Sequence, residues 1–584
     1  MRRLLLVLLL CVTAAACGRT AETPAQPAPA ADPRVRELAD AYLNGLFEND
    51  PELATYYGVP GRRHDRLKDN SLAALQRWHE REDRWLADAR AIEPAAIQSA
   101  SLRATYAIIR ESLEASAGSR VCRAELWPVS QMTGWHVGYG YLATIQPVSS
   151  EDERQQALAR WGQLPRYLDT EIANLREGLK QGYSSPKHIV QIVITQVRQL
   201  ANTPAAQSPF AAPGAAAKTP EFQKAFTALV AEQITPALRR YADFLEKEYL
   251  PGAREAIPVS ANRDGAQCYA ASIRAYSTLP RTPREVHDTG LREVARIDAA
   301  MKAIAERAFG TGDVPALMQQ LRTDPKYTFR TRQELIAYSQ AALARARKAA
   351  PQWFGILPTS DVRIEPYPAY REVSGAPGEY NPPSEDGTRA GLFYINASQP
   401  AKTTRADIES TAFHETIPGH HLQIAIAVER KDIHPLGRYL ISSGYSEGWG
   451  LYAEELADEM KLFSGDLDRL GMYSSQNWRA ARLVVDSGLH AFGWTRQQAI
   501  DYMLAHTPQS AESAASEVDR YIIMPGQATA YMLGKLEISA AREEMRKAAG
   551  NAFDIKAFHD RVLEDGGIPL TFLREKIRAA SAAP

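Results

Sequence analysis

The stretch that decides the fold is His-Glu-Thr-Ile-Pro-Gly-His-His, residues 414–421. A His-Glu pair followed closely by another histidine is typical of helices that bind zinc. In the regular form of such a helix the second histidine stands four residues after the first, but here Pro418 takes that place. On an unbroken helix His420 would face away from His414. We therefore predict a break at Pro418-Gly419, because proline interrupts a helix and glycine tolerates a bulge.

A zinc site that hydrolyses its substrate needs three protein ligands and one open position. With the helix broken, His414 and His420 can supply two of them, and His421 is the rival for the second place. The third ligand is expected from the following helix, where Glu447 lies in the first turn of Ser-Glu-Gly-Trp-Gly and Glu454 is the lesser candidate. We expect one zinc ion bound by His414, His420 and Glu447.

Glu415 follows the first histidine directly and is the expected general base. A carboxylate in this position can take a proton from the attacking water and pass it to the leaving amine. The competing interpretation is a plain helix with two core histidines and a chance glutamate. A His-Glu pair, a Pro-Gly pair and a His-His pair within eight residues have no evident packing purpose.

These residues also carry a resemblance. Residues 413–423, the Glu-Gly-Trp at 447–449, and Arg520-Tyr521 with the Pro-Gly-Gln-Ala at 525–528 resemble the bacterial family known as domain of unknown function 885, grouped with the gluzincin metallopeptidases. The likeness extends from about residue 35 to 575. More distantly, the Gly-His at 419–420 and Arg520-Tyr521 are similar to segments of angiotensin-converting-enzyme-like peptidases.

The resemblance implies that Tyr521 stabilises the oxyanion, that His414, His420 and Glu447 are ligands, and that Glu415 is the base. The departure is a two-residue insertion between the histidines. A phenol near a metal can also donate to a developing oxyanion on general grounds.

Several further residues are candidates for the same site. Gln527 and Tyr531 are four residues apart after another Pro-Gly pair and could share a cleft wall, Gln527 binding substrate and Tyr531 assisting catalysis. Arg389 and Arg520 could bind a substrate carboxylate through forked hydrogen bonds.

Asp486 and His490 are four residues apart, so the carboxylate could orient the imidazole as a catalytic or supporting group. They also belong to a competing motif, because residues 444–448 fit G-x-S-x-G and would make Ser446 the nucleophile of a serine hydrolase. A third class is a catalytically silent lipoprotein that only binds peptides.

The N-terminus predicts export. Arg2-Arg3, an apolar run and small residues lead to Cys17, so residues 1–17 read as a signal peptide with a lipobox. Residues 18–33, rich in Ala and Pro, read as a tether. We expect a lipid anchor at Cys17 on the periplasmic side of the envelope. Cys122 and Cys268 could pair there or remain separate thiols.

Residues 34–580 read as one peptidase domain. Helical periodicity dominates, for example over 72–92, 151–182 and 283–309, whereas 391–396 reads as a strand. The expected fold is mainly α and zincin-like, a large two-lobed helical unit with a deep cleft and a small sheet beside the zinc helix. An extended peptide could pair with the edge of the strand at 391–396. Residues 203–218 read as a surface loop or hinge.

The formal net charge of −1 gives no support to nucleic-acid binding. The predicted activity is hydrolysis of short peptides outside the cytoplasm. Peptide length, end preference and oligomeric state stay open.

Overall fold

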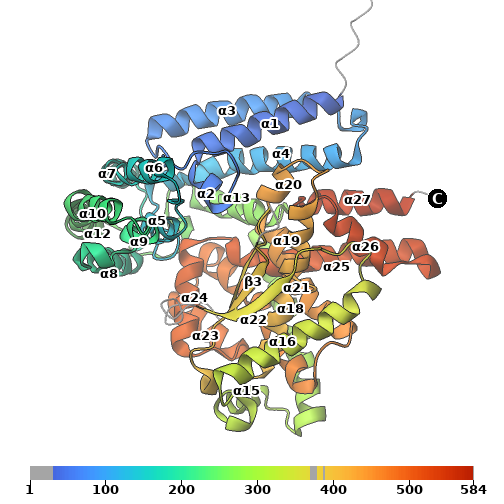
Figure 1. The fold of residues 1–584 in the computed structure, drawn as a ribbon. Helices are drawn as coiled ribbons and strands as arrows, with labels where there is room; N and C mark the ends of the chain where they lie inside the picture. The colour runs from blue at the N-terminus through green and yellow to red at the C-terminus, as the bar shows by residue number, and fades with distance from the viewer. Residues whose placement is uncertain (1–30, 368–377, 386–388, 583–584) are drawn as a thin grey trace, which may run out of the picture.

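The computed structural model describes residues 31–367, 378–385 and 389–582 (Figure 1). The chain is mainly helical with one small sheet, as predicted. The predicted signal peptide with Cys17, and residues 18–30 of the predicted tether, lie outside these ranges. The end of the predicted tether, residues 31–33, belongs to the first helix instead.

The first half of the chain supplies two groups of helices, drawn in blue and in cyan to green (Figure 1). Their bounds are α1 (Ala31–Asn49), α2 (Glu52–Tyr56), α3 (Leu72–Arg90), α4 (Ala100–Ser119), α5 (Trp135–Thr144), α6 (Glu151–Trp161), α7 (Leu164–Gln181), α8 (Lys187–Asn202), α9 (Ala212–Ala216), α10 (Pro220–Leu229), α11 (Thr235–Phe244), α12 (Leu250–Gly252) and α13 (Gly265–Ser277). The helices α1, α3 and α4 pack together, and α13 packs both on α4 and on the later helices α21, α22 and α25.

The second half carries the predicted metal ligands. Its helices are α14 (Pro283–Ile304), α15 (Val314–Thr323), α16 (Arg332–Ala349), α18 (Ala406–Glu415), α19 (His420–Glu429), α20 (Leu436–Tyr439), α21 (Ser443–Glu459), α22 (Asp466–Ala491), α23 (Arg496–His506), α24 (Ala511–Ile523), α25 (Ala530–Ala549), α26 (Ile555–Leu563) and α27 (Leu570–Ala582). The long helix α22 packs against α14 and α18, and α21 packs against α25.

The sheet has three strands in the order β1-β3-β2: β1 (Val362–Pro366) runs parallel to β3 (Gly391–Ile395), and β2 (Gly378–Asn381) runs antiparallel to it. The strand predicted over 391–396 is therefore present as β3. The idea that a peptide pairs with its edge is wrong, because β3 is central and both of its edges are already paired. The strand β2 contacts α18, so the sheet lies beside the predicted zinc helix.

Local capping signals account for several helix ends. Thr282 and Glu285 form the reciprocal capping box at the start of α14, with Pro283 in the first turn. The prediction of a plain loop over 203–218 was wrong in part. Short helical turns and α9 lie there, and Phe210 is fully buried, so an apolar anchor holds this segment against the core.

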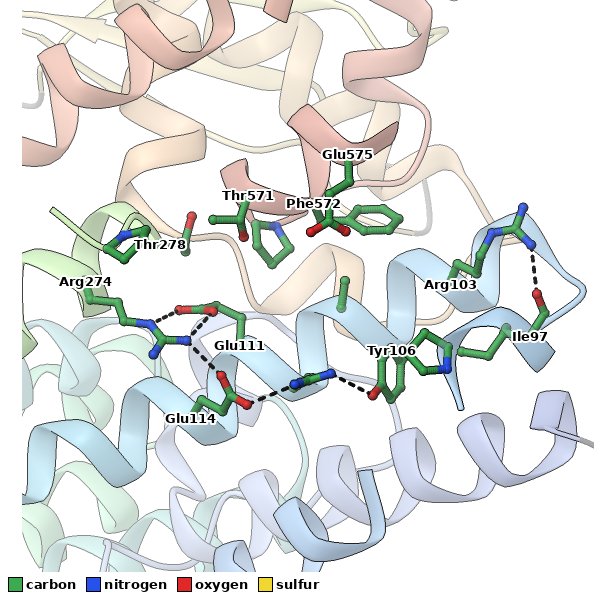
Figure 2. A pocket seen from close by; sticks show the side chains of 15 residues that line it. Ile97, Arg103, Tyr106, Glu111, Glu114, Arg274, Thr278, Thr571, Phe572 and Glu575 are labelled. Atoms are coloured by element: carbon green, nitrogen blue, oxygen red, sulfur yellow. Dashed lines mark hydrogen bonds and ion pairs between the residues drawn. The ribbon is translucent and has the colours of Figure 1, made fainter. Parts of the chain in front are cut away.

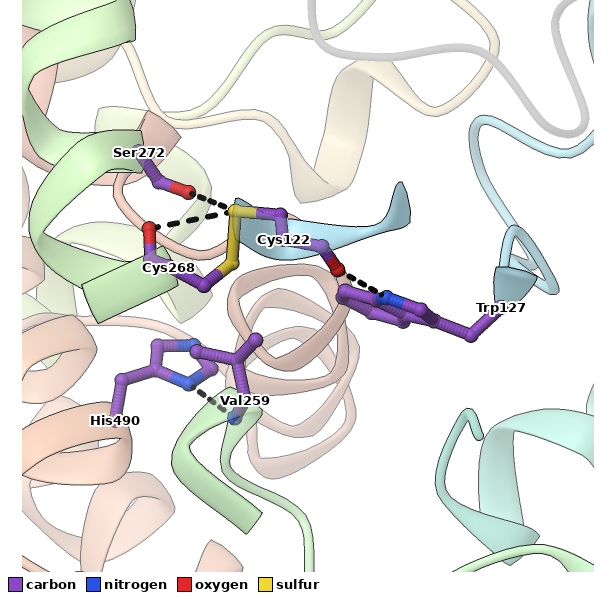
Figure 3. The surroundings of a disulfide bond; sticks show 6 residues. All are labelled: Cys122, Trp127, Val259, Cys268, Ser272 and His490. Atoms are coloured by element: carbon purple, nitrogen blue, oxygen red, sulfur yellow. Dashed lines mark hydrogen bonds between the residues drawn. A yellow bond between two sulfur atoms is a disulfide. The ribbon is translucent and has the colours of Figure 1, made fainter. Parts of the chain in front are cut away.

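Cys122, just after α4, and Cys268, in α13, form a disulfide (Figure 3). Sequence reasoning left this pairing open. The bond links residues 146 positions apart and ties the N-terminal helices to the helix that contacts α21, α22 and α25. Among the residues that the structure describes, no helix has the length and apolarity needed to cross a membrane.

Candidate metal centre

The predicted break in the zinc helix is present. The helix α18 ends at Glu415 and α19 begins at His420, and the peptide bond before Pro418 is cis. Gly419 lies so close to the preceding turn that a Cβ on it would stand 1.9 Å from the carbonyl oxygen of His414. Only glycine therefore fits at this point. The loop between the two helices turns His420 back towards His414.

His414, His420 and Glu447 come together, and one ligand atom from each lies within 4.8 Å of the other two. The Nε2 atoms of His414 and His420 are each 3.5 Å from Oε2 of Glu447. Ligands about 2.0–2.2 Å from a tetrahedral zinc ion are roughly 3.4 Å apart, so these two separations fit a single zinc ion. Two imidazole nitrogens and one carboxylate oxygen are also a donor set that zinc accepts.

Glu454, two turns after Glu447 on α21, holds the other side of His414. Its Oε1 lies 2.8 Å from Nδ1 of His414, and an ionised carboxylate can only accept, so Nδ1 donates and Nε2 faces Glu447. Gln476 on α22 donates to the second oxygen of Glu454 over 3.3 Å. Glu454, the lesser candidate for a ligand from the sequence, is instead placed to orient the imidazole of His414.

The charges within this cluster depend on each other. Burial opposes protonation of His414, but its hydrogen bonds to Glu447 and Glu454 outweigh burial and raise its pKa to about 10. Burial acts to raise the pKa of Glu447, yet the two histidines overcome it and hold that pKa well below its usual value. The carboxylate of Glu447 is thus ionised and available to a cation.

The position of α21 is set by close backbone contacts. Gly448 and Gly534 let α21 and α25 touch, since a Cβ on Gly448 would stand 2.5 Å from the main chain of Gly534. A Cβ on Gly450 would stand 2.7 Å from the ring of His414. Trp449, fully buried, donates from Nε1 to the carbonyl oxygen of Pro418 over 2.9 Å and so ties α21 to the helix break.

His421 does not join the cluster. Its Nε2 lies 3.1 Å from the carbonyl oxygen of Ser360, and its Nδ1 lies 3.0 Å from the hydroxyl of Tyr380 on β2. Burial lowers the pKa of His421 to about 4, so the ring is neutral. Of the two rivals, the structure brings His420 to His414 and Glu447.

Tyr380 was not singled out from the sequence. Burial raises the pKa of its hydroxyl, and the negative charges of Glu415 and Glu429 add to this effect. Tyr380 is brought near Glu415 and His421 by the pairing of β2 with β3. This contact is not predictable from neighbouring residues, and the only local signal is the Tyr-Asn-Pro-Pro segment at 380–383.

Glu415 lines a pocket of about 560 Å³ next to the helix break. The end of the sheet contributes Gly378 and Ile395, and α22 contributes Trp478 and Arg479. Its volume lies in the range of small-molecule sites. Among the site residues predicted from the sequence, Glu415, the expected base, is thus the one that lines this pocket.

Tyr521 lies in a separate buried network. Its hydroxyl donates to Glu517 over 2.8 Å and accepts from Nε of Arg482 over 3.1 Å and from Nε1 of Trp478 over 3.3 Å. Burial raises its pKa. Trp478 is the link between this network and the pocket that Glu415 lines. For Tyr521 to act on an oxyanion, its hydrogen bond to Glu517 would first have to break, so that role stays a prediction.

The other residues predicted to contact substrate do not line the pocket beside Glu415. Arg520 donates to Oε1 of Gln527 over 2.7 Å and lies 3.5 Å from the hydroxyl of Tyr531. None of these three lines the pocket beside Glu415. Arg389 is exposed and lies two residues before β3.

The predicted pairing of Asp486 with His490 was wrong. The Nδ1 atom of His490 accepts from the backbone N–H of Val259 over 3.0 Å (Figure 3). Its Nε2 donates to the carbonyl oxygen of Tyr521 over 3.0 Å. Asp486 accepts instead from the hydroxyl of Tyr269 over 2.6 Å. With both ring nitrogens engaged and burial lowering its pKa to about 4, His490 holds backbone segments together, which leaves no free nitrogen for catalysis.

The serine-hydrolase interpretation also fails on geometry. That motif needs its serine on a sharp turn between a strand and a helix. Residues 444–448, Ser446 included, lie inside α21, which follows α20 and a short connection. The proposed partners His490 and Asp486 bond to other groups.

Comparisons with known proteins agree with this fold. The crystal structure of "the putative lipoprotein from Colwellia psychrerythraea" superposes with a TM-score of 0.86 at 25% identity, covering 94% of this chain and 99% of that one. The structure of "a putative lipoprotein of unknown function from Shewanella oneidensis" gives a TM-score of 0.75 at 17% identity, covering 93% and 99%. A search of curated proteins gives no match. A family model matches residues 51–577, and the chain belongs to that family, described as "Bacterial protein of unknown function (DUF885)".

Proposed function

We propose that this protein is a zinc-dependent peptidase of the gluzincin type that hydrolyses short peptides. The observation that carries the proposal is the cluster of His414, His420 and Glu447, with Glu415 directly after the first ligand and facing a pocket. The Nε2–Oε2 separations of 3.5 Å suit one zinc ion, and Glu454 orients His414 as a carboxylate commonly orients a zinc-binding histidine.

Each residue has a separate task in this proposal. A zinc ion, when bound, polarises the scissile carbonyl and lowers the pKa of water. Glu415 takes the proton of the attacking water and later gives it to the leaving amine. Glu454 fixes the tautomer of His414, and Trp449 holds the helix break in place through Pro418. The open side of Glu415 towards the pocket leaves room for the substrate.

We further propose a zincin-like arrangement of two lobes around this centre, and export with a lipid anchor at Cys17. The disulfide between Cys122 and Cys268 suits an oxidising compartment. The two structurally similar proteins described as lipoproteins support the same location.

The test compares the wild type with Glu415→Gln, purified under identical conditions. Metal analysis should find about one zinc ion per chain in both proteins, because Glu415 is not a ligand. Hydrolysis of a mixed peptide library, followed by mass spectrometry, should occur only in the wild type and should stop with a chelator. We expect a loss of at least roughly a hundredfold in the variant, in line with the removal of a general base.

A different result would identify the competing function. A wild type that holds zinc and binds peptides but cleaves none would be a binding lipoprotein that has kept the site. A wild type without zinc affinity would refute the metal centre altogether.

A further inference from the structure

The pocket beside Glu415 contains polar atoms that lack partners. Nε of Arg322, Nε of Arg479 and Oε1 of Gln509 are all buried, and none has a hydrogen-bond partner among the residues that the structure describes. All three residues line the same space of about 560 Å³. A buried polar atom without a partner costs free energy, and three around one pocket point to a ligand that supplies the partners.

The two arginines differ in what they already bind. Arg322 lies 3.7 Å from the carboxylate of Asp407, which also lines the pocket. Arg479 donates to Ser475 over 2.5 Å, and its guanidinium stacks over Trp478. Across the described part of the chain, no carboxylate forms an ion pair within 4.0 Å of Arg479. Of the two arginines that line the pocket, Arg479 is therefore the one whose charge is not held in a described ion pair, and a substrate anion can meet it.

Another cavity, lined in part by arginines, shows the contrast. It has about 500 Å³ and lies between α4, α13 and α27 (Figure 2). Its Arg274 pairs with Glu111 and Glu114, and its Arg103 donates to the carbonyl oxygen of Ile97. Arg274 is neutralised, and among the described residues neither Arg274 nor Arg103 has a buried nitrogen without a hydrogen-bond partner, so that cavity shows no comparable demand for an anion.

One further feature favours a negative group in the pocket beside Glu415. Ser510 and Ser513, at the N-terminal end of the 13-residue helix α24, also line it. The N-terminus of a helix carries partial positive charge and attracts anions. Gln509, directly before that end, offers its unpartnered oxygen to an N–H donor.

We infer that this pocket binds the C-terminal residue of a short peptide, with Arg479 bonding the free α-carboxylate and Oε1 of Gln509 accepting from the last amide N–H. The inference rests on the proposed function and names its substrate end: the bond cleaved lies close to the C-terminus. Arg479 takes the role that sequence reasoning gave to Arg389 and Arg520, neither of which lines the pocket.

The experiment uses one peptide library made twice, as free acids and as C-terminal amides of two to five residues. Retention on the zinc-loaded Glu415→Gln protein and cleavage by the otherwise unmodified protein are both read by mass spectrometry. Free acids should be retained and cleaved preferentially, and Arg479→Met should lower kcat/KM for the acids by roughly ten- to a hundredfold more than for the amides. The matched control is Arg292→Met, an exposed arginine on α14, which should behave like the wild type.

The outcomes separate the two ideas. Equal cleavage of acids and amides would overturn the carboxylate assignment and leave the peptidase intact. Selective retention of acids without any cleavage would uphold the pocket and refute the peptidase. Retention of neither form, or an equal loss with both forms in Arg479→Met, would also overturn the inference.

Discussion

Glu454→Gln tests whether the proposed zinc site depends on a group outside its proposed set of ligands. Glu454 is 1% exposed, and its Oε1 lies 2.8 Å from Nδ1 of His414. Glutamine keeps the volume but removes the negative charge that fixes the tautomer of the ligand and raises its basicity. Loss of such a partner typically weakens metal binding by about 10- to 100-fold, or about 1.4–2.8 kcal/mol.

The assay is zinc affinity measured against a competing chelator, with circular dichroism to show that the variant is folded. Glu455→Gln is the matched control, because the neighbouring glutamate pairs with Lys535 on α25 and not with a histidine. We expect a higher Kd for zinc in Glu454→Gln alone. A Kd within twofold of the wild type, or an equal loss in the control, would refute the assigned role.

Three further predictions concern the packing of the site, a buried acid and the disulfide. Gly450→Ala should weaken zinc binding by roughly tenfold, because the new Cβ displaces the ring of the first ligand; Gly465→Ala, with open space around it, should not. Burial raises the pKa of Glu171 to about 7, above its value of 4.5 in the unfolded chain. The ionised carboxylate therefore destabilises the folded state, and this destabilisation increases from pH 4.5 to above pH 7, where it reaches about 3 kcal/mol. Glu171→Gln should therefore raise the melting temperature at pH 8 and change little at pH 5; an equal gain at both would contradict this account. Reduction of the bond between Cys122 and Cys268 should cost about 2–5 kcal/mol and lower the melting temperature, whereas a double serine variant should not respond to the reductant.

Local signals predicted local structure well. The capping box at Thr282, the strand near residue 391 and the helix break at Pro418-Gly419 depend on neighbouring residues, and each is present. The spacing within 414–421 also indicated that a second histidine could reach His414 only if the helix were broken, but it left His421 as a rival to His420.

Contacts between residues far apart in the sequence could not be predicted from such local patterns. The pair Asp486 and His490 has the right helical spacing, but their partners Tyr269 and Val259 come from segments more than two hundred residues earlier. Arg479 and Tyr380 reach the neighbourhood of Glu415 only through the packing of α22 on α18 and the order of the three strands. No periodicity in the sequence encodes either arrangement.

The contact between Gly448 and Gly534 has a consequence for engineering this protein. The backbones of α21 and α25 touch at Gly448, one residue after Glu447. The position of the Glu447 carboxylate is therefore fixed by this backbone contact rather than by the shapes of the surrounding side chains. Redesign of the apolar residues on the outer faces of α21 and α25 should then change the melting temperature while the distances between His414, His420 and Glu447 stay the same. A single methyl group added at either glycine would force the two helices apart, so the geometry of the proposed zinc site could be altered there.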